Sequence, residues 1–284
     1  MNTVPSVRPS PIAGSWYSAD PAALANEIKG YLSSAKILPL SGDLVGLISP
    51  HAGYFYSGPT AGYAYRATLN MQFDLCVVVS PLHNYLPYPL LSSAHSAYAT
   101  PLGQVEVDHD LLADLDRQLV ENGMPGLQLI ANDREHSLEI QLPFLQTALE
   151  EPFRLLPLMV RTADAQMLEK TGSILADLVR DQKTLLVAST DLSHFYDEKT
   201  ANGFDKVMLE QMSQFSPAGV LQAEADEEGF ACGSGAVAVV LWASKALGAD
   251  KVTLLHHSTS ANSSGDTSSV VGYGALAITR QEEI

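Results

Sequence analysis

Short runs of valine, isoleucine and leucine alternate with amphipathic stretches along most of this 284-residue sequence. Three of the runs end in a polar turn with a histidine, in the segments LVGLISPHAGYFYSG, LCVVVSPLHNY and LLVASTDLSHF. Apolar runs of this length are typical of buried strands, and their alternation with helical patterns is typical of α/β domains. The sequence therefore predicts an α/β fold with a largely buried mixed sheet flanked by helices.

The predicted elements follow one another without a linker that would divide the chain, so we expect one domain over residues 1–284. Strands are predicted at residues 44–49, 75–80, 154–160, 184–189, 252–256 and 270–278. Helices are predicted at residues 21–34, 59–69, 108–122, 137–149, 164–181, 199–211, 217–225 and 235–247. Residues 90–107 are expected to form short strands and a turn at the sheet edge, and residues 258–269 a surface loop.

Charge and hydropathy exclude two classes of partner. The formal net charge of −16 opposes general binding to nucleic acid, because such binding depends on clustered lysine and arginine. The longest apolar runs are shorter than the roughly 20 residues that cross a bilayer, so no membrane role is expected. The N-terminal segment lacks an apolar signal core, and two cysteines do not imply a disulfide framework, so we expect a cytoplasmic protein.

Polar side chains follow the carboxyl ends of predicted strands, namely His51, His83, Asp191 and His194. Ligands of open α/β sheets bind beyond the carboxyl ends of the strands. The strand order can therefore deliver these side chains to one crevice.

Two Ser-Pro turns each place a histidine after an apolar run, and these are His51 and His83. Either one alone is explained as a hydrogen-bonded turn residue. Cys232 lies at the start of an apolar helical stretch, where a thiolate is electrostatically favoured, whereas Cys76 is expected to be a small buried apolar residue. Two imidazoles and one thiolate form a ligand set for a divalent transition metal with open positions for water or substrate.

Two further pairs of residues allow a structural and a functional interpretation. Asp191 and His194 are close enough to meet if their turn is helical, so His194 would act as general acid or base and Asp191 as its orienting partner or a further ligand. The alternative is that Asp191 caps a helix. His136 and Glu139, with Glu135 beside them, form either a surface capping arrangement or second-shell partners that fix a ligand tautomer.

The remaining histidines carry weaker signals, and they are His95, His109, His256 and His257. Gly-rich phosphate-binding loops and the GxSxG nucleophile motif are absent from the sequence. Nucleotide binding of those types and serine hydrolase chemistry therefore lack their usual residues.

Several motifs together resemble the Memo family, whose bacterial and archaeal members are called AmmeMemoRadiSam system protein B. In chain order they are PSPIAGSWYSAD, PHAGYFYSGPTAGYAY, SPLHNY, REHSLEIQLPFL, LVASTDLSHF, ACGSG and VVGYGALAI, and they span almost the whole chain. The resemblance implies a fold similar to that of class III extradiol ring-cleaving dioxygenases. It also implies association with an AMMECR1-type protein and a radical SAM protein.

Matched motif by motif, the resemblance places metal ligands at His51, His83 and Cys232, and further pocket residues at Asp191 and His194. The dioxygenases use a carboxylate where this family has the thiolate, and the softer ligand favours different metals and oxidation states. The segment LHNY departs from the family pattern, in which a second histidine or a Gly-His pair is common, so the pocket rim is expected to differ.

Three functional hypotheses follow. The first is a metal-dependent oxidoreductase that binds iron(II) or copper, with zinc as a further option, and acts on an unknown small molecule or peptide. The second is a non-catalytic module that binds a peptide or protein in a pocket lined by aromatic residues such as Tyr17, Tyr54 and Tyr56. The third is a zinc-dependent hydrolase that uses a bound water of lowered pKa.

Overall fold

Four parallel strands form the centre of the large mixed sheet in this computed structural model, which describes residues 6–281. In spatial order they are β2 (Asp43–Ser49), β9 (Thr184–Ser189), β3 (Leu75–Pro81) and β8 (Arg154–Val160). Nearly every residue of these strands is buried, which explains their continuous apolar character. Cys76 lies among them with no exposed surface, as expected for a small apolar residue.

Antiparallel strands extend the sheet on both sides of this centre. On the β2 side, β12 (Val270–Arg280) pairs with β2 and also with β11 (Lys251–Thr259) and β10 (His194–Tyr196). On the β8 side, β4 (Leu90–Ser93) is antiparallel to β8 and parallel to β7 (Gln128–Ile130). The prediction of a largely buried mixed sheet is therefore confirmed.

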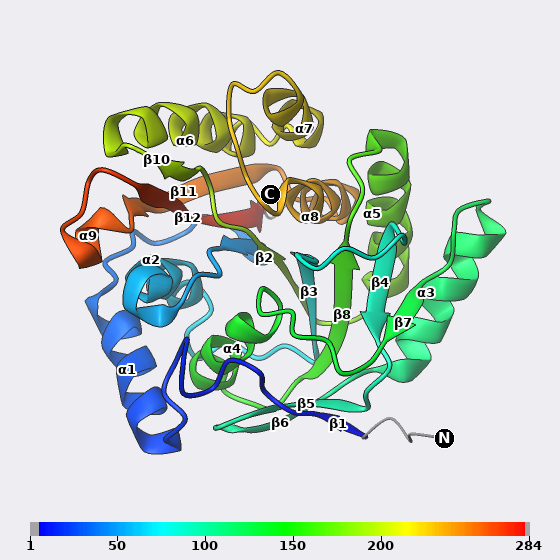
Figure 1. The fold of residues 1–284 in the computed structure, drawn as a ribbon. Coiled ribbons are helices and arrows are strands. Elements are labelled where there is room, and N and C mark those ends of the chain that lie inside the picture. The colour runs from blue at the N-terminus through cyan, green and yellow to red at the C-terminus, as the bar shows by residue number, and fades with distance from the viewer. Residues whose placement is uncertain (1–5, 282–284) are drawn as a thin grey trace.

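A second, three-stranded sheet lies below the first in Figure 1 and contains the N-terminal strand of the described chain. Its strands are β1 (Val7–Arg8), β5 (Ala97–Thr100) and β6 (Gly103–Glu106). Together with β4 they are the short strands predicted for residues 90–107. This sheet brings the N-terminal segment close to the loop before residue 139, because Arg8 bonds with Asp133.

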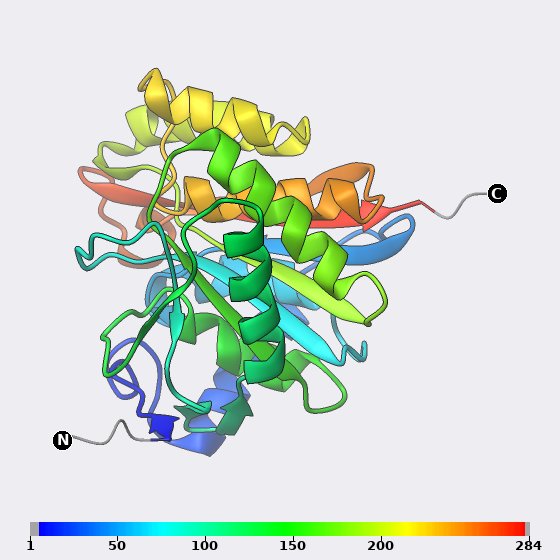
Figure 2. The ribbon, with the colours of Figure 1, turned by 90° about the vertical axis from the view of Figure 1, so that its right-hand side faces the viewer.

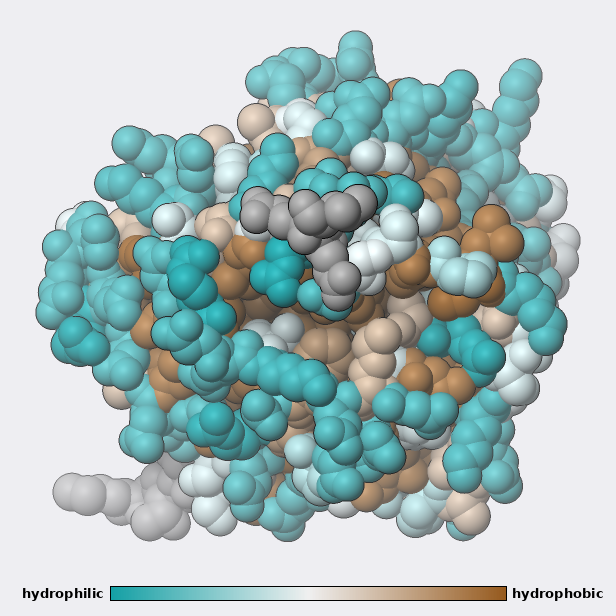
Figure 3. Space-filling view, turned by 180° about the vertical axis from the view of Figure 1, so that it is seen from behind, coloured by the Kyte–Doolittle hydropathy of each residue, from teal (hydrophilic) through white to brown (hydrophobic). Residues whose placement is uncertain are grey.

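Helices cover both faces of the large sheet, and Figure 1 shows the two layers. One face carries α1 (Pro21–Ser34), α2 (Tyr54–Arg66) and α4 (Leu142–Ala148), which contact one another. The other face carries α3 (His109–Glu121), α5 (Ala165–Val179), α6 (Glu198–Ser213), α7 (Pro217–Ala225) and α8 (Ser234–Ala246). Figure 2, turned by 90°, shows α3 and α5 in front of the strands, and Figure 3 shows a mostly hydrophilic surface from behind.

No helix in the described part of the chain is long and apolar enough to cross a membrane.

Three predicted elements differ markedly from the structure. Helix α2 begins at Tyr54, before the predicted start, and contains Pro59. The buried ring of Tyr54 and the close packing of Gly58 on Tyr31 stabilise this early turn, although Pro59 lacks an N–H donor. The helix predicted for residues 137–149 is divided into the 3-10 helix η1 (Glu139–Gln141) and α4. The predicted loop 258–269 contains the end of β11 and the short helix α9 (Ala261–Ser264).

Candidate metal centre

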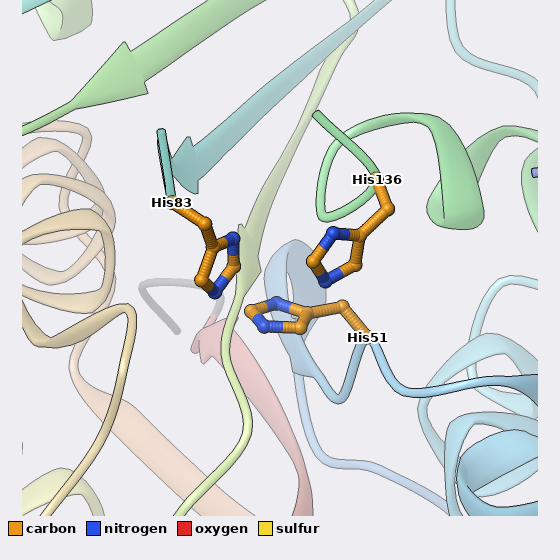
Figure 4. A group of neighbouring side chains, drawn as sticks. All are labelled: His51, His83 and His136. Carbon is orange, nitrogen blue, oxygen red and sulfur yellow. The ribbon is translucent and has the colours of Figure 1, made fainter. Parts of the chain in front are cut away.

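Three imidazoles point toward one another at the carboxyl edge of the large sheet (Figure 4). They belong to His51, His83 and His136, and each offers a nitrogen that lies within 4.8 Å of the nitrogens of the other two. The ring centroids are 5.3 Å apart for His51 and His83, and 4.6 Å apart for His83 and His136. Within residues 6–281 these three histidines are the group of His, Cys, Asp or Glu side chains whose ligand atoms all lie this close to one another.

The parallel strands explain why His51 and His83 meet. His51 follows β2 and His83 follows β3, and both strands pair with β9 between them. Their carboxyl ends therefore lie at the same edge of the sheet. His136 reaches this edge from the loop before η1, so no strand pattern in the sequence marks it as a member of the cluster.

His51 is buried on all sides, with 1% of its surface exposed. Its backbone N–H donates a hydrogen bond to Asp191 Oδ1 at 2.7 Å, and its ring Nδ1 lies 3.0 Å from Ser189 Oγ. Burial lowers the pKa of His51 well below its usual value, and the neighbouring rings of His136 and His83 lower it further. A neutral imidazole is the form that binds metals.

His83 has a carboxylate partner, Glu135. Its ring Nδ1 lies 2.9 Å from Glu135 Oε1, and its backbone N–H donates to Oε2 at 2.6 Å. The hydrogen bond to Glu135 raises the pKa of His83, and burial partly opposes this. Burial also disfavours the Glu135 carboxylate, but the bonds from His83 and the N–H of Ser137 outweigh it and hold the pKa of Glu135 well below its usual range. A carboxylate that bonds with the outer nitrogen of an imidazole is the usual second shell of a metal-binding histidine.

His136 is the third imidazole of the cluster rather than an outer partner of the other two. The ring of Trp16 lies against it, with a centroid distance of 4.2 Å. Burial lowers the pKa of His136 to about 4, with Glu135 opposing and His83 adding to this effect. Its backbone N–H donates to Glu135 Oε1 at 2.9 Å, so the same carboxylate holds two of the three histidine segments.

Cys232 lies beside the cluster and contacts one of its members. Its Sγ is 3.1 Å from His51 Nε2 and accepts a hydrogen bond from the N–H of Asp191 at 3.3 Å. Cys232 lies just before α8, as predicted. Burial and the carboxylate of Asp191 raise the pKa of this thiol in the metal-free site, which opposes the thiolate expected at a helix start.

The predicted contact between Asp191 and His194 does not form. Residues 190–193 do not form the helical turn, because Leu192 and Ser193 bond with Gly272 of β12 and His194 begins β10. The carboxylate of Asp191 instead approaches His51, with Oδ2 4.0 Å from Nε2. The Nδ1 of His194 donates to the carbonyl of Leu192 at 2.7 Å, and burial lowers the pKa of His194.

Glu139 belongs to a separate buried cluster of hydrogen-bonded side chains. Its carboxylate accepts hydrogen bonds from Arg8, Ser10 and the hydroxyl of Tyr17. The carboxylate that bonds with an imidazole of the centre is Glu135, which the sequence places beside His136. Sequence reasoning does not separate these two glutamates, because Arg8, which binds Glu139, is 131 positions away along the chain.

The other four histidines have partners outside the cluster. The Nε2 of His109 bonds with the carbonyl of His95, and His95 Nε2 accepts from the N–H of Asn132. His256 stacks on Tyr63, and His257 bonds with Asp205 at 2.8 Å.

Comparison with known proteins agrees with this architecture over nearly the whole chain. The family model described as Memo-like protein matches residues 8–277. This chain belongs to the Memo family. A MEMO1 family protein of Nitrosopumilus maritimus is 35% identical over 235 residues, covering 82% of this chain and 84% of that protein. A MEMO1 family protein of Methanopyrus kandleri is 33% identical over 279 residues, covering 95% of this chain and 98% of that protein.

Among solved structures, an uncharacterized protein from Escherichia coli K12 is similar with a TM-score of 0.44 and 15% identity. The match covers 82% of this chain and 99% of that chain. The similarity is too weak for any inference about this member of the Memo family.

A pocket of about 500 Å³ lies beside the imidazoles of this Memo protein. Its walls include Trp16, Ala52, Gly53, Tyr56, Phe195 and Tyr273. Trp16 contacts His136, and Ala52 directly follows His51, so the pocket adjoins the centre. The sequence also predicts Tyr17 and Tyr54 in such a wall, but both are buried, with hydroxyls that donate to Glu139 and to the carbonyl of Ile140.

Proposed function

We propose that this Memo protein is an oxidoreductase that depends on one transition-metal ion, iron(II) or copper, held by His51 and His83. The observation that carries the proposal is the convergence of three imidazoles within 4.8 Å, of which His51 is buried, His136 half-buried and His83 exposed. Imidazole donors suit iron, copper and zinc, whereas magnesium and calcium sites are built from oxygen ligands.

Cys232 and His136 are proposed to complete the donor set with His51 and His83. Two ligand atoms of one ion, a sulfur and a nitrogen at normal bond lengths, are separated by about 3 to 3.5 Å. The distance of 3.1 Å between Cys232 Sγ and His51 Nε2 falls in this range. A bound metal ion would replace the thiol proton and supply redox and Lewis-acid chemistry next to the pocket.

Asp191 and His194 are proposed to hold and move protons beside the centre. Burial raises the pKa of Asp191 to about 7, although N–H donors of His51 and Ala52 oppose this shift. In the metal-free site both protonation states of this carboxyl are therefore accessible near neutral pH, as a general acid or base requires. The ring centroid of His194 lies 5.6 Å from that of Phe195, which lines the pocket.

Metal analysis of purified protein tests the proposal. Wild type loaded with iron(II) or copper is expected to retain about one ion per chain, and His51→Ala and Cys232→Ser to lose most of it. The matched control is His109→Ala, because His109 lies outside the cluster on the exposed start of α3. Equal metal content in all four proteins would sink the proposal. Ester or amide hydrolysis with zinc and no redox activity with any metal would instead favour a hydrolase.

The aromatic pocket favours peptide binding as a second candidate function. Tyr56 and Phe195 line it and are exposed by 43% and 76%, so large apolar rings face solvent at its mouth. Binding of an aromatic peptide that survives removal of the metal and is lost in Trp16→Ala would support this role. Strict metal dependence of substrate consumption would argue against it.

A further inference from the structure

The hydroxyl of Ser189 lies beside the Nδ1 of His51 and has three hydrogen-bond partners. They are the carbonyl oxygen of Ser137 at 2.5 Å, the side-chain Nε2 of Gln141 at 2.8 Å and the Nδ1 of His51 at 3.0 Å. Ser137 and Ser189 have no exposed surface, and Gln141 is 1% exposed. Because the network is closed to solvent, each hydrogen bond in it must have its donor and its acceptor among these groups.

The Ser189 hydroxyl donates its proton to the carbonyl of Ser137, because a carbonyl oxygen can only accept. The orientation of the Gln141 amide is determined in the same way. Its nitrogen lies 3.0 Å from the carbonyl of Pro50, and its oxygen accepts from the hydroxyl of Tyr65 at 2.8 Å. The two N–H protons of Gln141 thus go to Pro50 and to Ser189.

Only a lone pair of Ser189 Oγ remains for His51, so the proton between these residues must belong to His51 Nδ1. We infer that Gln141 and Ser189 are positioning residues that hold His51 in the Nδ1–H tautomer and direct the Nε2 lone pair toward the metal centre. The Nε2 is the nitrogen that lies 3.1 Å from Cys232 Sγ. The tautomer follows from the hydrogen bonds alone, whereas its role in metal binding rests on the proposed function.

The same network reaches the other two histidine segments. The N–H of Ser137 donates to Glu135 Oε1, and its hydroxyl donates to the carbonyl of Pro81 at 2.9 Å. Glu135 holds His83, and Pro81 ends the strand that leads to it. Ser189 therefore contacts the ring of His51 and also, through Ser137, the loop that carries His136.

The test is the tautomer of His51 in the metal-free protein, measured by long-range proton–nitrogen correlation NMR of nitrogen-labelled histidine, with His51→Ala for assignment. Wild type is expected to show Nδ1–H. Ser189→Ala is expected to shift His51 toward Nε2–H and to weaken metal binding by about 10- to 100-fold. Ser92→Ala, the loss of a buried hydroxyl in β4 that donates to the carbonyl of Pro157, is the matched control and should leave the tautomer unchanged.

An Nε2–H tautomer in wild type would overturn the inference. So would an unchanged tautomer and metal affinity in both Ser189→Ala and Gln141→Leu, the second of which covers a failure of the first to fold. Because the tautomer is read without metal, an Nδ1–H ring in a protein that binds no metal would refute the proposed function and leave the tautomer assignment standing.

Discussion

At the scale of single residues, one carboxylate binds two of the three histidine segments of the candidate metal centre. Glu135 is 2% exposed and accepts hydrogen bonds from the ring and backbone of His83 and from the N–H of His136 and Ser137. A buried carboxylate is stable only when such donors replace its hydration. The orientation of His83 and the path of the loop to His136 thus depend on the same side chain.

Glu135→Gln is expected to lower stability in a pH-dependent way in the metal-free protein. The bond to Glu135 raises the pKa of His83, so its contribution is complete below the unfolded pKa of about 6.5 and is lost as pH rises through the folded pKa. The lowered pKa of Glu135 keeps this carboxylate ionised in mild acid. Urea unfolding should therefore show a larger gap between wild type and variant at about pH 5.5 than at about pH 8.5. A gap that does not change with pH would contradict this account.

The strand-end pattern predicts where His51 and His83 lie because the direction of a parallel strand determines where its last residues point. It does not predict the position of His136, which lies in a loop. The path of this loop depends on contacts with Arg8 and Trp16 that are distant in sequence. For the same reason Asp191 is predicted near the centre, but its contact with His51 instead of His194 follows from the pairing of β10 with β12.

At the scale of elements, the short strand β1 holds the loop of the third imidazole. Arg8 is 1% exposed, forms ion pairs with Asp133 and Glu139, and donates to the carbonyl of Glu135 at 2.6 Å. This side chain connects the N-terminal segment to both ends of the loop that carries His136. The small sheet is therefore a support for the centre as well as a cover for the core.

Arg8→Ala should destabilise the protein by about 3 to 5 kcal/mol, because it leaves two buried carboxylates without their cation. Arg117→Ala is the control. Arg117 pairs with Asp114 and Glu121 on the exposed face of α3, where solvent weakens ion pairs, so its loss is expected to change stability far less than the loss of Arg8. Urea unfolding of both variants measures the difference, and similar losses in the two would refute a supporting role for Arg8.

The limits of strands and helices follow the sequence pattern closely where burial is one-sided or complete, as in the central strands. The predicted limits are wrong where tertiary contacts override the local conformational preference. Proline is predicted to begin α2, but the helix starts earlier because Tyr54 is buried and its N–H donates to the carbonyl of Trp16. Such a contact between distant segments has no signature in the local sequence.

At the scale of the whole molecule, the candidate centre joins segments that are far apart along the chain. Its donors follow β2 and β3, precede η1 and precede α8, and the contact between His51 and Cys232 spans 181 positions. An ion bound there would connect both halves of the sequence across the carboxyl edge of the sheet. Metal binding should therefore be coupled to global unfolding as well as to local order.

Loading with the proposed metal is expected to raise the thermal midpoint of wild type, and a chelator should reverse the effect. Binding at a free metal concentration of 100 times the dissociation constant stabilises a folded protein by about 2.7 kcal/mol. Scanning calorimetry with and without metal should show this shift in wild type and His109→Ala, but not in His51→Ala. Because all of these donors belong to one cooperative fold, the whole transition should move. A shift confined to part of the transition, or one that persists without His51, would place the bound ion elsewhere in the protein.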